Sequence, residues 1–65
     1  MNILVNGKAR EVNAQTLPLV LVELGYGNAV VATALNGQFV PIAAREQMSL
    51  HDNDRLEIVA PMQGG

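Results

Sequence analysis

The residues best placed to do chemistry are the last two, Gly64 and Gly65, because they end the chain in a backbone carboxyl group with no side chain beside it. A carboxylate is a poor acyl donor, and a pKa of about 3.3 to 3.7 keeps it ionised at neutral pH. Joining it to AMP makes a mixed anhydride that a sulfur nucleophile can open, which leaves a C-terminal thiocarboxylate. The chain itself needs no catalytic side chain for this chemistry.

The segment before the glycines predicts a tail that can enter another protein. Residues 62–65 follow Pro61 and can extend by roughly 13 Å, at about 3.3 Å per residue. Glycine has no Cβ, so a narrow channel that excludes most side chains admits it. We therefore expect residues 1–61 to form one domain and 62–65 a flexible tail, in which Gly64 passes through the channel and Gly65 carries the reactive carboxyl group.

Composition excludes several other kinds of chemistry. The 65-residue chain has no cysteine, so thiol nucleophiles, disulfides and thiolate metal sites are absent. Its net charge is −2, and its four Lys and Arg residues form no cationic stripe for nucleic acid. Asp52-Asn53-Asp54 lacks the glycine and the distal glutamate of a calcium loop, and His51 has no convergent partner. We expect no metal site, no bound cofactor and no enzymatic centre.

The same sequence carries no basic leader followed by an apolar run and no apolar run of the roughly 18 residues that a membrane span needs. We expect a soluble cytoplasmic protein that is monomeric on its own.

The hydrophobic pattern predicts two hairpins and a final strand. In the first strand, Ile3 and Val5 alternate with Leu4, which is expected to face outward. Asn-Gly pairs accept the positive φ values of tight hairpins, and each of the two pairs in the sequence is expected to join two strands. The predicted strands are 2–6, 8–13, 30–35, 38–40 and 55–60, with turns at Asn6-Gly7 and Asn36-Gly37.

One main helix is predicted between the hairpins, from Leu17 to Leu24. Its boundary signals are Thr16 as N-cap, Pro18 in the first turn and Gly25 as a left-handed terminator. Residues 42–50 are expected to hold a short helical turn or a minor strand, and residues 51–54 a polar turn.

The resulting order of elements predicts an α+β fold. A helix that crosses between two hairpins must lie over one face of a mixed sheet, here of four to five strands. This order resembles the β-grasp of ubiquitin-like proteins, in which the first and last strands lie side by side at the centre of the sheet.

A candidate docking surface follows from the alternation in the two central strands. Leu56, Ile58 and Ala60 are expected to face the core, which turns Val59 outward beside Leu4. Exposed hydrophobic side chains beside a reactive tail are typical of a partner contact, so the predicted partner-binding set comprises Leu4, Val59, Met62 and Gln63.

The chain resembles the ThiS family, the sulfur carriers of thiamin biosynthesis, nearly from end to end. The matching pieces are Met1 to Gly7, Leu24-Gly25, Ala34 to Gly37, Val40-Pro41 and Asp52 to Gly65. Two positions depart from the family pattern. Asn53 stands where glycine is common, although asparagine also tolerates left-handed backbone. Ile42 stands where a basic residue often follows the proline, which puts partner contacts at that point in doubt.

The resemblance implies a carrier that is acted upon. An adenylyltransferase related to ubiquitin-activating enzymes would use ATP to adenylate Gly65. A donor such as a cysteine desulfurase would supply sulfur, and thiazole synthase would take it from the thiocarboxylate to build the thiamin thiazole. The alternatives are a carrier for molybdopterin synthesis, a modifier that is conjugated to proteins, and a non-catalytic ubiquitin-like interaction module.

Overall fold

Two Asn-Gly turns form the two hairpins of the sheet, as predicted. The computed structural model describes residues 1–61. In the first turn, Asn6 has a φ of 51° and Gly7 a φ of 84°, and in the second, Asn36 and Gly37 have φ values of 51° and 85°. Positive φ at both central residues matches the right-handed twist of the strands that such a turn joins. The turns connect β1 (Asn2–Val5) to β2 (Lys8–Glu11) and β3 (Ala32–Leu35) to β4 (Gln38–Val40).

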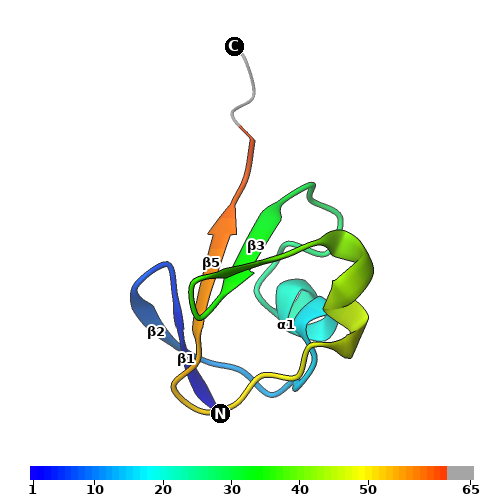
Figure 1. Cartoon of the computed structure of the whole chain (residues 1–65). Helices are drawn as coiled ribbons and strands as arrows, with labels where there is room; N and C mark the ends of the chain where they lie inside the picture. The colour runs from blue at the N-terminus through cyan, green and yellow to red at the C-terminus, as the bar shows by residue number, and fades with distance from the viewer. Residues whose placement is uncertain (62–65) are drawn as a thin grey trace.

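The hairpins and β5 (Arg55–Val59) make one five-stranded sheet with the order β2-β1-β5-β3-β4. β5 is parallel to β1 and antiparallel to β3, so the first and last strands are neighbours at the centre. Figure 1 shows α1 on one side of this sheet and the chain leaving β5 at the end of the molecule opposite the N-terminus. The predicted α+β arrangement with a mixed sheet and one main helix is confirmed.

The helix α1 (Leu17–Glu23) begins after its predicted N-cap residue and is followed by its predicted glycine terminator. Thr16 is the N-cap residue, with extended backbone but no capping hydrogen bond from its side chain. At the other end, Gly25 has a φ of 96°, its N–H donates to the Val22 carbonyl at 3.0 Å, and the Tyr26 N–H donates to the Leu21 carbonyl at 2.8 Å. This pair of bonds is the Schellman arrangement, which satisfies carbonyls that the helix end leaves unpaired.

The segment after Pro41 folds as a 3₁₀-helix, η1 (Ile42–Gln47), followed by a single β-bridge between Thr16 and Ser49. Arg45 holds this helix against the sheet, because its guanidinium donates to the Thr33 hydroxyl at 3.1 Å and to the Val31 carbonyl. The Thr33 hydroxyl in turn donates to the Val40 carbonyl at 3.0 Å, so this buried side chain is fully satisfied. Both alternatives predicted for residues 42–50 are therefore present in part.

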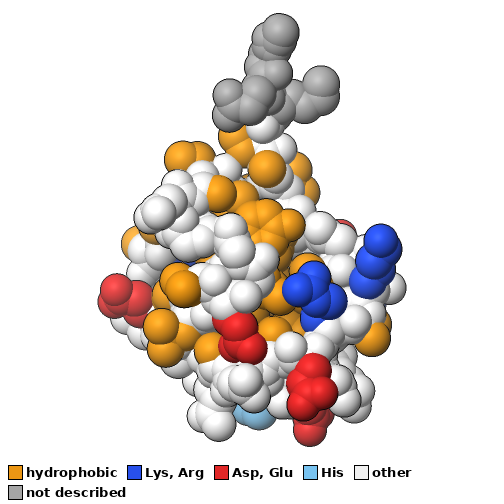
Figure 2. Space-filling model, turned by 180° about the vertical axis from the view of Figure 1, so that it is seen from behind, with side chains coloured by type: hydrophobic (Ala, Val, Ile, Leu, Met, Phe, Trp, Pro, Cys, Tyr) orange, Lys and Arg blue, Asp and Glu red, His pale blue; other side chains and the backbone are white. Residues whose placement is uncertain are grey.

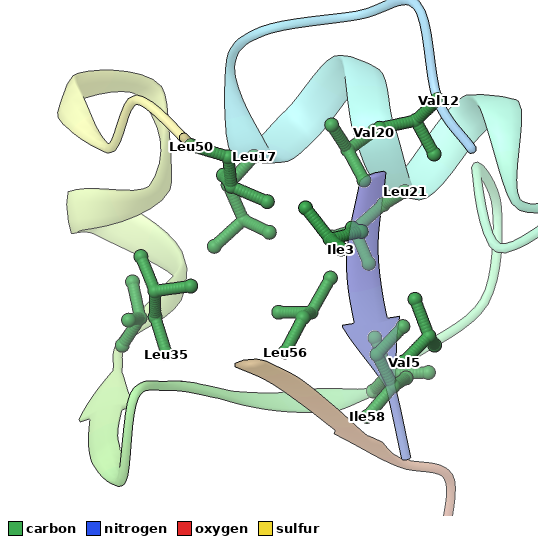
Figure 3. Close-up of a cluster of buried hydrophobic side chains, with 12 residues drawn as sticks. Ile3, Val5, Val12, Leu17, Val20, Leu21, Leu35, Leu50, Leu56 and Ile58 are labelled. Carbon is green, nitrogen blue, oxygen red and sulfur yellow. The ribbon is translucent and has the colours of Figure 1, made fainter. Parts of the chain in front are cut away.

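The core lies between α1 and the sheet face that carries Ile3, Val5, Leu56 and Ile58. Figure 3 shows side chains of the helix directed at those of β1 and β5. A 65-residue domain buries only about 60% of its unfolded surface, so nearly every apolar residue on these faces is needed. The buried hydrophobic residues are Ile3, Val5, Val12, Leu17, Val20, Leu21, Val31, Leu35, Val40, Leu50, Leu56 and Ile58.

Several predicted boundaries and one predicted core residue are wrong. The first strand ends at Val5, not at residue 6, and the second ends at Glu11, not at residue 13. Ala60 is exposed, not part of the core, because β5 ends at Val59 and the residues after it leave the sheet. The third strand begins at Ala32, not at residue 30, because it pairs with β5 from Ala32 opposite Val59 onward. The helix ends one residue early, since Leu24 is the C-cap.

Glu23 joins the end of α1 to the loop that follows β2. Its carboxylate accepts hydrogen bonds from the backbone N–H of Asn13, at 3.0 and 2.9 Å, and of Ala14, at 2.9 Å. The Ala14 bond, then the Asn13 bond, lower the pKa of Glu23 below its ordinary value of 4.5. A lowered pKa in the folded state means that the unfolded chain takes up a proton first as the pH falls. The bonds therefore stabilise the fold fully above about pH 4.5 and less below it.

We expect Glu23→Gln to be less stable than the natural chain at neutral pH and the gap in unfolding free energy to narrow as the pH falls below 4.5. Other carboxylates, Asp54 among them, titrate in both proteins, so the difference between the two isolates Glu23. Urea unfolding followed by circular dichroism from pH 7 to pH 3 measures it. A gap that stays constant over this range would contradict the role given to the ionised carboxylate.

Candidate functional site

The base of the C-terminal segment is the end of β5, which is held on both edges. On one edge, Val59 lies opposite Ala32 of β3 and Ile58 lies opposite Thr33. On the other, the Asn6 side chain continues the contact with β1, because its Oδ1 accepts from the Ile58 N–H at 2.8 Å and its Nδ2 donates to the Ile58 carbonyl at 3.1 Å. Ala60 and Pro61 then carry the chain away from the sheet (Figure 1).

The start of β5 is held by a second asparagine amide. The Asn36 Oδ1 accepts from the Arg55 N–H at 2.9 Å, and its Nδ2 donates to an Asp54 carboxylate oxygen at 3.0 Å. Partial burial raises the pKa of Asp54, but the hydrogen bonds from Asn36 and from the His51 N–H outweigh that effect and lower it. The first residue of β5 is therefore fixed by the second hairpin, as Ile58 is by the first.

The polar turn before β5 has a structural role in the described chain. Asn53 has a φ of 71°, which confirms that asparagine accepts the left-handed backbone there. Asp52 accepts a hydrogen bond from the Asn2 N–H at 2.9 Å, and the exposed imidazole of His51 lies 3.9 Å from Asp54. Among residues 1–61, no group of three acidic or histidine side chains is arranged to hold a metal ion. Nor is any helix in that range long and apolar enough to cross a membrane.

Leu4 and Val59 lie on the sheet face opposite α1, as predicted, but they are not neighbours. Leu4 lies opposite Arg55, at the start of β5, whereas Val59 is its last residue. Leu4 is 37% exposed and Val59 is 64% exposed. They line two different hollows on this face, and Glu57 borders both of them.

The hollow next to the C-terminal segment is more apolar than the one at Leu4. Its lining side chains on the open face come from three adjacent strands, and we name it the apolar hollow: Ala32, Ala34, Phe39 and Val59, with Glu57 at its edge. Phe39 lies opposite Ala34 in the β3–β4 pair and is 69% exposed. The alternation in the sequence predicted Val59 here, and the register adds Phe39.

Exposed hydrophobic side chains occur on the helix side as well. On α1, Leu19 is 60% exposed and Val22 is 59% exposed. Figure 2, the view from behind, shows hydrophobic side chains at the surface across the middle of the molecule, with basic side chains on the right of the view and acidic ones in the lower half and on the left. Exposure alone therefore does not distinguish Val59 from these residues. What distinguishes Val59 is its position in the chain, two residues before Pro61.

The remaining predicted site residues lie outside the described part of the chain. They are Met62, Gln63, Gly64 and Gly65. Their roles, and the division of the chain into a domain of residues 1–61 and a tail, stay predictions.

Comparison with known proteins identifies the family. The model of the ThiS family matches residues 3–65. The chain belongs to the ThiS family. Two solved structures of similar proteins agree with this assignment. The crystal structure of thiamine biosynthesis protein ThiS from Geobacter metallireducens has a TM-score of 0.84 and 30% sequence identity, with both chains covered completely. The solution structure of a thiamine biosynthesis protein from the same organism has a TM-score of 0.82 and 29% identity over this whole chain and 88% of the other.

A third relative of this ThiS-family chain is much longer. A thiazole synthase from Paramagnetospirillum magneticum is 38% identical over 66 residues, which cover this whole chain and 20% of that protein. The chain thus spans about a fifth of the length of the curated relative that it matches. The resemblance to the ThiS family and the predicted β-grasp fold are both confirmed.

Sequence reasoning missed the side chains that hold β5 in this ThiS-family chain. Asn6 and Asn36 were given backbone roles only, as strand or turn residues, and their side-chain amides also bond β5. The signal was present, since asparagine rather than glycine occupies the first turn position twice. Arg45 gave no such signal, because its partners become neighbours only through the packing of η1 on β3.

Proposed function

We propose that this chain is a sulfur carrier of thiamin biosynthesis whose reactive group is the C-terminal carboxylate of Gly65. The observation that carries the proposal is that the family match continues through the diglycine to residue 65. The arrangement of the described residues supports it, because β5 is anchored on both edges close to the point where the chain leaves the sheet.

The chemistry takes place on the end of the backbone. The carboxylate oxygen attacks the α-phosphorus of ATP, a P–O bond breaks, and pyrophosphate leaves with its electron pair. The product is an acyl adenylate, in which AMP is a good leaving group. A sulfur nucleophile at the oxidation level of hydrosulfide then attacks the carbonyl carbon, and AMP departs, which leaves a thiocarboxylate. ATP and the catalytic side chains belong to the adenylyltransferase. The sulfur comes from a donor such as a cysteine desulfurase, whose persulfide sulfur reaches the hydrosulfide level when a thiol supplies two electrons.

Thiazole synthase is the proposed acceptor of the sulfur. The support is the 38% identity to a segment of a protein named thiazole synthase, in which a domain of this kind forms about a fifth of the chain. The same tail chemistry would serve a molybdopterin carrier, but the similar proteins with solved structures are thiamine biosynthesis proteins. A thiazole-forming assay with the thiocarboxylated chain distinguishes the two acceptors.

The apolar hollow is the proposed contact for the adenylyltransferase. An enzyme that encloses Gly65 must come close to the end of β5, and the hollow is the apolar surface on the open face at that end. Aromatic side chains at the centre of an interface often dominate its binding energy, so Phe39 is the expected anchor. Leu4 lies in β1 beside the other end of β5, opposite Arg55, and is expected to contribute less to the binding energy.

We expect Phe39→Ala to weaken association with the adenylyltransferase by roughly tenfold or more, as truncation of an aromatic anchor does. Leu19→Ala is the matched control, since that side chain is similarly exposed but lies on α1, on the other side of the sheet. Isothermal titration with the purified enzyme measures both. Equal affinities for the two variants would remove the apolar hollow from the interface and leave the carboxyl chemistry untouched.

The test of the proposed function itself is ATP–pyrophosphate exchange. Addition of this chain to the adenylyltransferase is expected to start exchange of labelled pyrophosphate into ATP, because the acyl adenylate forms reversibly. If the chain binds the enzyme without starting exchange, it is an interaction module and not a carrier.

A further inference from the structure

The contact between β1 and β5 extends beyond the residues that pair through their backbones, because a side chain continues it. That pairing ends at Val5, opposite Leu56, and the chain then turns back through Asn6 and Gly7. The Asn6 N–H still donates to the Leu56 carbonyl at 2.9 Å, and its side-chain amide bonds both the N–H and the carbonyl of Ile58. The carboxamide thus replaces the next residue that a longer β1 would have supplied.

This side chain gives β5 its second edge where the strand is about to end. At Ile58, β3 lies along one edge and Asn6 along the other, whereas Val59 lies opposite Ala32 of β3. A strand held along one edge can pivot about that line of hydrogen bonds, and a strand held along two edges cannot. Three residues after Ile58 the chain reaches Pro61, the last described residue, so the direction of exit is set here.

We propose that Asn6 is a positioning residue, whose carboxamide fixes the direction in which β5 presents the C-terminal segment to the adenylyltransferase. The proposal rests on the proposed function. Without the Asn6 carboxamide, the carboxyl group would be presented over a wider range of directions and would enter a narrow channel less often. Loss of this side chain should therefore weaken productive binding and leave the rate of the chemical step unchanged.

Asn36 provides a matched control within the same chain. It occupies the same position in the same type of turn, with the same φ of 51° and a glycine after it, and its amide also bonds the backbone of β5. It does so at Arg55, the first residue of that strand, far from the exit. Glycine accepts positive φ at both positions, so Asn6→Gly and Asn36→Gly remove equivalent amides without straining either turn.

The test measures KM and kcat of the adenylyltransferase for the natural chain and the two glycine variants at saturating ATP. We expect Asn6→Gly to raise KM by about fivefold with kcat nearly unchanged, which is the effect of losing a small number of hydrogen bonds on binding. Asn36→Gly is expected to leave both constants close to those of the natural chain, although both variants lose some thermal stability. Asn6→Asp, which keeps an acceptor for the Ile58 N–H, is expected to fall between the natural chain and Asn6→Gly.

A second measurement does not depend on any enzyme. Residual dipolar couplings of the Val59 and Ala60 amides in the free protein are expected to decrease in Asn6→Gly and to stay unchanged in Asn36→Gly. Equal KM values for the two glycine variants, or couplings that do not change in Asn6→Gly, would overturn the role given to Asn6. If the natural chain is not adenylated at all, the proposed function fails, and the couplings still decide whether Asn6 orients the end of β5.

Discussion

A chain that ends at Gly64 is expected to lose sulfur transfer completely. Removing Gly65 shortens the reach of the segment by about 3.3 Å and places the carboxyl group one residue short of the nucleotide in the partner. A misplacement of even 1 Å can cost two orders of magnitude in rate, so a shift of a whole residue should leave no measurable turnover. The measurement is thiazole formation in cells that lack their own carrier and depend on the introduced chain.

The control for this truncation separates presentation from folding. The described residues 1–61 form a buried core of their own, so loss of Gly65 is not expected to change the unfolding transition. A truncated chain that folds normally and still supports growth without added thiamin would show that the reactive group lies elsewhere.

The largest effect on stability is expected from Leu56→Ala. Leu56 is fully buried in the central strand, opposite Val5 on one side and Leu35 on the other. Truncating a buried leucine costs about 2 to 5 kcal/mol, because the lost burial adds to the cavity left behind. A domain of this size has a total stability of about 3 to 10 kcal/mol, so the variant should lose a large part of its stability.

Leu19→Ala is the control for this substitution too. Its side chain is 60% exposed on α1, and alanine favours helix, so its unfolding free energy should differ from that of the natural chain by less than about 1 kcal/mol. Urea unfolding of the three proteins gives the comparison. A Leu56→Ala protein as stable as Leu19→Ala would mean that the core is not centred on β5.

The features that the sequence predicted correctly are those with a local cause. Asn-Gly pairs determine their own turns, and Gly25 ends a helix because glycine adopts positive φ at low cost. Alternation places Ile3 and Val5 inside and Leu4 outside for the same local reason. The centre of the sheet was predicted through family resemblance, since no local signal states that β1 and β5 are parallel neighbours.

The features that the sequence did not predict depend on register. The offset of β1 against β5 decides which residue of β5 lies beside Leu4. That residue is Arg55 and not Val59. Phe39 and Val59 line the same hollow because β3 lies between their strands. Ala34 of β3 lies opposite Phe39, and Ala32 of β3 lies opposite Val59. The same offset brings Ile58 to the Asn6 amide, a contact between residues 52 positions apart.

The most direct test of the account is the intact mass of the chain after incubation with ATP, a sulfur source and the adenylyltransferase, followed by fragmentation from the C-terminus. We expect a mass increase equal to the replacement of one oxygen by sulfur, and we expect the fragment ending in Gly65 to carry the whole increase. No change in mass in the presence of an enzyme that is active on its own carrier would contradict it, as would sulfur found on any other residue.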